Sequence, residues 1–232
     1  MIIALNNKSN LGKSEFILYL EKLKNINTVH DLILCPTSLN ISLFSPSDLS
    51  LGAQNVSRTD DGAYTGEISA KQLKSFNVEY CIVGHSERRE YQKESLEEVS
   101  EKVKKLLEND IVPILCIGET KEERLSNQYK EVLEKELNSV INSLNAEEKE
   151  KIIVAYEPIW SIGTGLIPNN EEIEEIIDYI KKFLPNNKVL YGGSANDNNI
   201  DQLNEVNGID GYLLGGLSLK PDNLKVFLDK IN

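Results

Sequence analysis

The sequence predicts an α/β fold in which eight parallel strands close into a (β/α)8 barrel. Short runs rich in β-branched and apolar residues recur along the 232 residues, and most are separated by a segment with helical periodicity. Eight such units in a domain-sized chain favour closure into a barrel, and we expect one domain over residues 1–232. The expected strands are 2–5, 32–35, 49–53, 80–83, 111–116, 152–156, 188–191 and 211–214.

The helical segments carry apolar stripes and start signals. Segment 95–109 opens with Ser95 and Glu98 at capping-box spacing and then repeats apolar residues on one helical face. Segment 170–184 repeats isoleucine in the same way. We expect further helices at 14–24, 129–144, 196–206 and 221–231, and a weaker one at 36–48.

An open doubly wound sheet is the alternative to the barrel. Open sheets that bind dinucleotides carry a G-x-G-x-x-G turn after the first strand, and this chain has none there. The barrel is therefore the preferred fold.

Composition and charge exclude several functions. A formal net charge of -12 disfavours nucleic acid and anionic membrane as partners, because no basic face would hold them. Cys35, Cys81 and Cys116 lie in or at the ends of apolar runs without metal-ligand spacing, so we expect reduced core thiols. With no secretory signal and no membrane-length apolar run, the expected location is cytoplasmic.

Residues 155–165 contain the most informative local pattern. Glu157 ends an apolar strand, and Pro158 holds it in extended backbone. Gly163 and Gly165 follow in a loop whose bare amides can approach an anion closely. A strand end with an ordinary turn is the simpler interpretation, but a base beside a phosphate-binding lid explains more.

Other reactive or glycine-rich positions also follow predicted strands. Asn6 and Lys8 come after the first, His85 after the fourth, and Gly192-Gly193-Ser194 and Gly215-Gly216 after the last two. Because function in such barrels sits at the carboxyl ends of the strands, we expect these residues to lie around one site.

Short motifs recur in order along the whole chain: Asn6-x-Lys8, Gly52-Ala-Gln-Asn55, Gly62-Ala-Tyr-Thr-Gly-Glu67, Gly84-His-Ser-Glu-Arg-Arg89, Cys116-Ile-Gly-Glu119, Ala155-Tyr-Glu-Pro-Ile-Trp160, Tyr191-Gly-Gly-Ser194 and Leu214-Gly-Gly216. Through these motifs the chain resembles the triosephosphate isomerase family, whose fold is the TIM barrel.

The resemblance implies an aldose–ketose isomerase of glycolysis and gluconeogenesis that acts through an enediolate. Glu157 would be the base that takes a proton beside the carbonyl of a triose phosphate. His85 would act as a neutral imidazole at a helix start, a state for which this family is itself the standard example. Lys8 would stabilise the developing charge, with Asn6 as an orienting donor.

The resemblance also assigns supporting residues. Glu87 would be an acid close to the site, and Glu94 an acid behind it that steadies the site and a subunit contact. Phosphate would meet the amides of Gly163, Ser194, Gly215 and Gly216, and no metal or cofactor is required. The lid would comprise Pro158, Ile159, Trp160, Ser161, Ile162, Thr164, Gly165, Leu166, Ile167 and Pro168, with Ile162 and Leu166 helping to desolvate Glu157.

A homodimer is the implied assembly. Thr65 matches the tip of a long loop that family members insert into a partner subunit beside the Asn-x-Lys segment. Two further positions keep structural interpretations: His30 as an ordinary side chain, and Cys116 as packing near the base.

The chain departs from the family pattern at three places. Asn7 stands where tryptophan is frequent and Leu5 where glycine is common, so the wall near Lys8 is expected to pack differently. Pro168 has no amide hydrogen, so Tyr191 cannot make a hydrogen bond to the lid backbone there. We expect an active enzyme with altered lid kinetics.

Two other classes of function are alternatives: a different phosphate-binding barrel enzyme, and a noncatalytic protein. A phosphate-sugar epimerase needs several metal-ligating side chains, and a Schiff-base aldolase needs a lysine inside a later strand; neither pattern is present. A noncatalytic phosphate-binding barrel or surface-displayed binding protein predicts damage at Asn6, Lys8, His85 or Glu157, and all four are intact.

Overall fold

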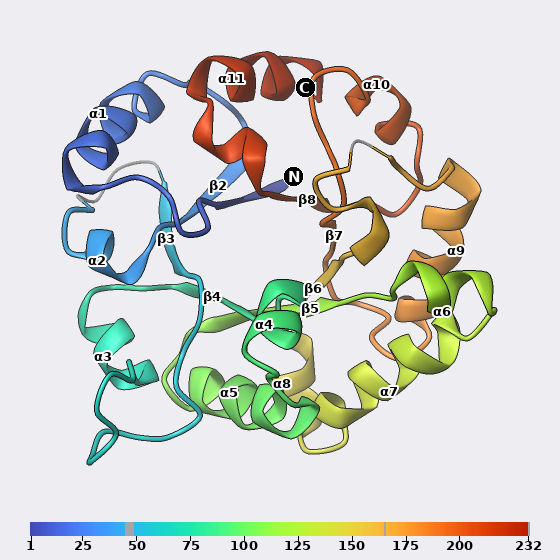
Figure 1. Ribbon diagram of the computed structural model, residues 1–232, viewed down its shortest axis with the longest axis horizontal. Helices are drawn as coiled ribbons and strands as arrows, with labels where there is room; N and C mark the ends of the chain where they lie inside the picture. The colour runs from blue at the N-terminus through green and yellow to red at the C-terminus, as the bar shows by residue number, and fades with distance from the viewer. Residues whose placement is uncertain (45–48, 165, 232) are drawn as a thin grey trace.

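The computed structural model describes residues 1–44, 49–164 and 166–231, and these form a closed barrel of parallel strands with helices around it (Figure 1). Each strand pairs with its neighbour in sequence, and β8 pairs with β1. The strands are β1 (Ile2–Asn6), β2 (Asp31–Cys35), β3 (Ser50–Ala53), β4 (Tyr80–Val83), β5 (Val112–Ile117), β6 (Ile153–Tyr156), β7 (Val189–Tyr191) and β8 (Gly211–Leu214). The predicted barrel is confirmed, and the open sheet is excluded.

The longer helices begin and end close to their predicted bounds. They are α1 (Lys13–Leu23), α5 (Leu96–Glu108), α7 (Tyr129–Ile141), α9 (Asn170–Lys181) and α11 (Pro221–Lys230). Shorter helices lie between them: α2 (Ser38–Ile41), α3 (Ala70–Ser75), α4 (Ser86–Tyr91), α6 (Lys121–Leu125), α8 (Ala146–Glu150) and α10 (Ile200–Leu203), with 3-10 turns η1 (Ile159–Ser161) and η2 (Gly216–Leu219).

Two apolar layers hold the barrel together. The strand side chains that face inward form a compact interior cluster that includes Ile33, Ile82, Ile114 and Leu190. The opposite strand faces pack against the helices in a larger cluster. Because both faces of each strand are covered, the strands read as continuous apolar runs, which is typical of parallel sheets.

Two predicted helices are shorter than expected. Helix 196–206 is reduced to α10, because Asn196 and Asn199 bond to nearby backbone instead: Asn196 Oδ1 accepts from the amide of Asn198, and Asn199 Oδ1 accepts from the amide of Asn196. Such local bonds compete with helix formation. Segment 36–48 contains only α2, and its residues 45–48 lie outside the described part of the chain.

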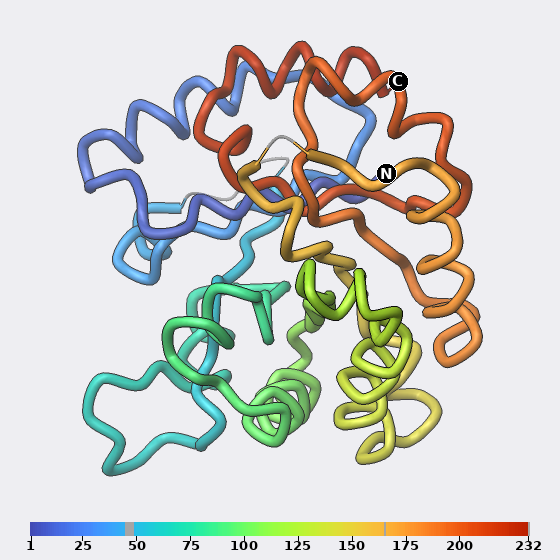
Figure 2. Tube along the Cα trace, turned by 45° about the vertical axis from the view of Figure 1, so that its right-hand side comes forward, coloured from blue at the N-terminus to red at the C-terminus, as the bar shows by residue number. Residues whose placement is uncertain are grey.

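The loop after β3, residues 54–69, extends away from the barrel (Figure 2). Its central residues are exposed, and Thr65 lies among them. The three cysteines are buried and form no disulfide, and in the described ranges no helix has the length and apolar character needed to cross a membrane.

Candidate active site

The carboxyl ends of the strands surround a cavity of about 420 Å³. Nine of the predicted site residues line it: Asn6, Lys8, His85, Glu157, Ile162, Gly163, Ser194, Gly215 and Gly216. A neighbouring cavity of about 440 Å³ shares Asn6, Lys8 and His85 and also contacts Glu87. The barrel end therefore collects the residues that the strand-end pattern grouped together.

The Glu157 side chain is buried and held from several directions. Its residue is only 1% exposed, and its backbone amide donates to the carbonyl of Ile117 over 2.7 Å. The amide of Ser86 donates to Oε2 over 3.1 Å. Gly192 leaves room for it, because a Cβ there would lie 2.9 Å from Cγ of Glu157. The carboxylate thus has a fixed position with Oε1 directed at His85.

His85 sits at the start of α4, between the base and a backbone donor. Its Nδ1 atom accepts from the amide of Glu87 over 3.2 Å, so the proton of a neutral ring lies on Nε2. That Nε2 lies 3.1 Å from Oε1 of Glu157. Gly84 precedes it with φ +69°, a backbone conformation that turns the chain from β4 into the site.

Lys8 occupies a left-handed backbone conformation, with φ +52°. Its amide donates to Oδ1 of Asn6 over 2.9 Å, and the side-chain amide of Gln54 donates to its carbonyl over 2.8 Å. These bonds hold a conformation that costs a non-glycine residue free energy. Its ammonium pairs with Glu87, whose carboxylate is partly exposed. Glu87 thus lies close to the site, as predicted, and forms an ion pair with Lys8.

Glycines make room opposite the base. A Cβ at Gly215 would lie 3.0 Å from Cε of Lys8, so glycine lets the lysine cross the cavity mouth. Gly163 has φ +71° and open space around it, and Gly216 has no neighbour within 4 Å of a built Cβ. Open backbone next to a cationic side chain is suited to an anion.

Glu119 anchors the first half of the lid. It belongs to the Cys116-Ile-Gly-Glu119 motif, but no role was predicted for it from the sequence. Its Oε1 accepts from the Tyr156 hydroxyl and from the Trp160 indole, both over 3.1 Å, and its carbonyl accepts from the amide of Ile159. Burial raises the pKa of the Glu119 carboxyl, which is fully enclosed. The sequence signal for this role was the position of the glutamate, two residues after the end of an apolar strand.

The rest of the lid is more open. Ile162 lines the cavity, whereas Leu166 is 58% exposed and does not cover Glu157 in this structure. Gly165 lies outside the described residues. Pro168 is buried next to α9, and Ser161, at the end of η1, is fully buried.

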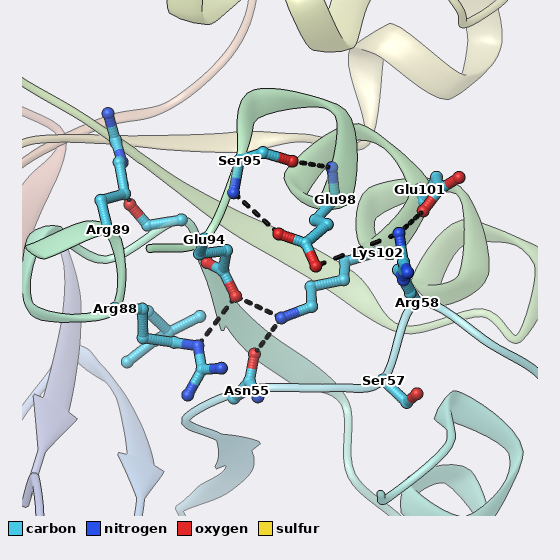
Figure 3. A network of polar contacts seen from close by, with 12 residues as sticks. Asn55, Ser57, Arg58, Arg88, Arg89, Glu94, Ser95, Glu98, Glu101 and Lys102 are labelled. Carbon is cyan, nitrogen blue, oxygen red and sulfur yellow. Dashed lines mark hydrogen bonds and ion pairs between the residues drawn. The ribbon is translucent and has the colours of Figure 1, made fainter. Parts of the chain in front are cut away.

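Glu94 belongs to a separate buried network behind the site (Figure 3). Its side chain is 2% exposed and pairs with Lys102 and with Nε of Arg88, the latter over 2.8 Å. Lys102 also donates to Oδ1 of Asn55 over 2.9 Å. Burial alone would raise the pKa of Glu94, but the bonds from Lys102 and Arg88 outweigh it and lower the pKa. The network ties the loop after β3 to α4 and α5.

A second buried pair was not anticipated from the sequence. Arg89 pairs with Glu136 and also donates to the carbonyls of Gly84 and Cys116, while Oε2 of Glu136 accepts from the amide of Gly118 over 2.9 Å. This pair joins the ends of β4 and β5 to α7. The one sequence signal for this pair is Glu136 itself, which interrupts the apolar stripe on the buried face of α7.

Cys116 lies beneath the base and stays a thiol. Burial raises its pKa well above the usual value, and the nearby charge of Glu157 adds to the shift. The side chain is therefore suited to packing. Among the described residues, no group of three or more histidine, cysteine or acidic side chains is arranged to hold a metal ion.

This geometry defines a class of protein. In this closed (β/α)8 barrel, a carboxylate, an imidazole and an ammonium group face one cavity, and open glycine backbone lies opposite them. This arrangement is typical of a barrel isomerase that acts on a small anionic sugar derivative. The family model for triosephosphate isomerase matches residues 1–232, and the chain belongs to this family.

Individual relatives match most or all of the chain. The chain is 43% identical to the triosephosphate isomerase of Mesomycoplasma hyorhinis, over 89% of this chain and 85% of that one. It is 39% identical to that of Alkaliphilus oremlandii (strain OhILAs), over 100% and 98% of the two chains. It is 37% identical to that of Clostridium botulinum (strain Loch Maree / Type A3), over 98% of each.

Proposed function

We propose that this chain interconverts dihydroxyacetone phosphate and D-glyceraldehyde 3-phosphate in glycolysis and gluconeogenesis. The observation that carries the proposal is the shared cavity, in which Glu157, His85 and Lys8 face open glycine backbone. Membership of the triosephosphate isomerase family supports the same reaction. Its substrate class is a triose phosphate.

In the proposed reaction, Glu157 removes a proton from the carbon next to the carbonyl. The bond from the Ser86 amide and the space left by Gly192 hold the carboxylate in one position before substrate arrives. A base fixed in advance loses little freedom when the substrate binds, which lowers the entropic part of the barrier. Protonated Glu157 then returns the proton to the neighbouring carbon.

The negative charge that develops on the substrate oxygens falls between His85 and Lys8. The Nε2 proton of His85 can be donated to either oxygen, because its other nitrogen is held by the amide of Glu87. Lys8, ion-paired with Glu87, supplies a positive charge at the cavity mouth, and Asn6 orients it through the Lys8 amide. Donors arranged in advance around a developing charge often give the largest part of catalysis.

The phosphate is proposed to bind at the opposite side of the cavity, to the amides of Gly163, Ser194, Gly215 and Gly216. These four residues line the cavity together with the catalytic groups. Their backbone donors compensate for a chain whose net charge is -12, since a local field decides anion binding at short range.

The subunit assembly is proposed to be a homodimer in the cytoplasm. The projecting loop around Thr65 offers an exposed tip, and the cavity of about 440 Å³ beside Lys8 offers a place to receive it from a second copy. Sedimentation of the wild type and of Thr65→Asp at equal concentration tests this, because a charge at the tip is expected to shift the variant toward monomer. Within each copy, residues 1–232 act as one domain.

The activity is tested by coupling isomerisation of glyceraldehyde 3-phosphate to reduction of the ketone product. Wild type is expected to turn over rapidly, and Lys8→Met to lose most of its kcat/KM, because the cavity then lacks the Lys8 ammonium that lines it together with Asn6 and His85. Lys13→Met, an exposed lysine at the start of α1, is the matched control. A folded wild type without isomerase activity would refute the proposal.

A further inference from the structure

The hydroxyl of Ser161 lies at the junction between the lid and the loop after β7. Its residue is fully buried, at the end of η1. The hydroxyl donates to the carbonyl of Leu166 over 2.5 Å, and the amide of Ser194 donates to Oγ over 3.2 Å. The Tyr191 hydroxyl lies 3.5 Å from the same atom.

These contacts use every hydrogen-bonding position of the serine. A hydroxyl has one proton, and here it goes to Leu166, so Ser194 and Tyr191 both donate to its lone pairs. Burial raises the pKa of Tyr191 to about 12, so the phenol keeps its proton at neutral pH. Tyr191 thus contacts a side-chain oxygen of the lid, whereas Pro168 has no backbone N–H that could donate to the Tyr191 hydroxyl.

The surrounding backbone is shaped to admit this cluster. A Cβ at Gly193 would lie 2.3 Å from the Tyr191 hydroxyl and 3.0 Å from Oγ of Ser161. A second bond joins the same two segments, because the Ser194 hydroxyl donates to the carbonyl of Ser161 over 2.5 Å. Ser161, at the base of the lid (the segment Trp160-Ser161 where the lid leaves the barrel), is therefore joined to Ser194 through both main-chain and side-chain groups.

The bond from the Ser194 amide to Ser161 occupies a donor that the phosphate is proposed to use. The Ser194 amide is a proposed phosphate donor, yet in this structure it donates to Oγ of Ser161. A single N–H makes one good hydrogen bond, so phosphate and Ser161 compete for it. A phosphate oxygen is the stronger acceptor because it is charged.

We propose that the Ser161 hydroxyl stands in for a phosphate oxygen at the Ser194 amide, so that phosphate binding displaces it and releases the base of the lid to move. This inference rests on the proposed function, because it requires phosphate at Ser194. Ser161 is a positioning residue in this account: it acts through Ser194 and the lid and does not touch the reacting carbons.

The test uses inorganic phosphate as the probe, with two readouts. The first is the inhibition constant of phosphate against the isomerase reaction. The second is the emission of Trp160, which is the only tryptophan in the sequence, lies one residue before Ser161 and is bonded to Glu119. Its emission reports the base of the lid without interference from other indoles.

Ser161→Ala removes the competitor and is expected to bind phosphate more tightly. One lost hydrogen bond corresponds to an inhibition constant about threefold to tenfold lower than that of wild type. Without phosphate, Trp160 emission in the variant should already be shifted toward the value that wild type reaches at saturating phosphate. A purely structural serine would give the opposite sign, with weaker binding.

Ser143→Ala is the control, because Ser143 is an exposed serine just after α7 that bonds a backbone carbonyl and another hydroxyl and lines neither cavity of the site. It should change neither readout. If Ser161→Ala does not fold, Ser161→Cys keeps the shape of the side chain with a weaker acceptor, and its inhibition constant should also fall.

An inhibition constant that is unchanged or higher in the Ser161 variant, with wild-type emission changes, overturns the inference while leaving the isomerase function in place. A wild type that neither isomerises triose phosphates nor binds phosphate overturns the proposed function and this inference together.

Discussion

The Nε2 atom of His85 lies 3.1 Å from Oε1 of Glu157, while Nδ1 of the same ring accepts the amide of Glu87. The backbone thus selects the tautomer, and the remaining ring proton points into the cavity beside the base. Substrate that enters between these two side chains would have its carbon next to the carboxylate and its oxygens next to the imidazole. The relationship predicts separate roles for the two residues.

His85→Gln removes the ring that serves the substrate oxygens but keeps an amide donor of similar reach. We expect kcat to fall by about 10²- to 10⁴-fold, the usual contribution of a positioned acid–base group, with a small change in KM. The coupled isomerase assay measures both. His30→Gln is the matched control, because the sequence has only these two histidines and His30 lies beside the amino terminus, 3.2 Å from the nitrogen of Met1. Equal losses in both variants would contradict the assignment.

Gly192→Ala tests whether the position of the base matters. The new Cβ would lie 2.9 Å from Cγ of Glu157 and 3.2 Å from the carbonyl of Tyr156, so the carboxylate must shift. A misplacement of this size is expected to reduce kcat by about 100-fold. Gly12→Ala, where the Cβ would meet its nearest atom at 3.5 Å, should keep wild-type kcat. Wild-type kcat in Gly192→Ala would show that the base tolerates displacement.

Glu94→Gln tests the buried network of Figure 3. Loss of the carboxylate leaves Lys102 buried without its charge partner, which typically costs about 3 kcal/mol of unfolding free energy. Denaturant unfolding at pH 7 and fixed protein concentration measures it. Glu101→Gln, which removes a half-exposed ion pair with Arg58 in the same view, should cost less than about 1 kcal/mol.

The same residue predicts a pH dependence. The folded-state pKa of Glu94 is lowered from its usual 4.5, so ionised Glu94 favours the folded state. Its contribution to stability is complete above that usual value and is lost as the pH falls through the lower, folded-state pKa. Wild type should therefore lose more unfolding free energy than Glu94→Gln between pH 5 and strongly acidic pH. Parallel acid-stability curves would refute this.

The catalytic part of the site could be predicted because its residues follow the ends of predicted strands. Lys8, His85 and Glu157 each follow an apolar strand, and a barrel brings all strand ends to one rim, so local sequence was enough to group them. The strands and the long helices were predicted to within a few residues for the same reason, because their periodicity is local.

Contacts between distant segments could not be predicted in this way. Ser161 and Ser194 are 33 positions apart, and Arg89 and Glu136 are 47 apart, so only the closed barrel brings them together. The helix expected at 196–206 was overestimated because asparagine side chains bond to the local backbone. Short α8 carries a capping box at Asn145 and Glu148, a signal that apolar periodicity alone does not detect.

The central claim is that Glu157 is the base of a triose phosphate isomerisation. Its most direct test is kcat for glyceraldehyde 3-phosphate with wild type, Glu157→Gln and the exposed control Glu150→Gln, each shown to be folded. We predict rapid turnover in wild type and control and a loss of about 10³-fold or more in Glu157→Gln, because the amide cannot accept the proton. Near-wild-type turnover in Glu157→Gln would contradict the claim.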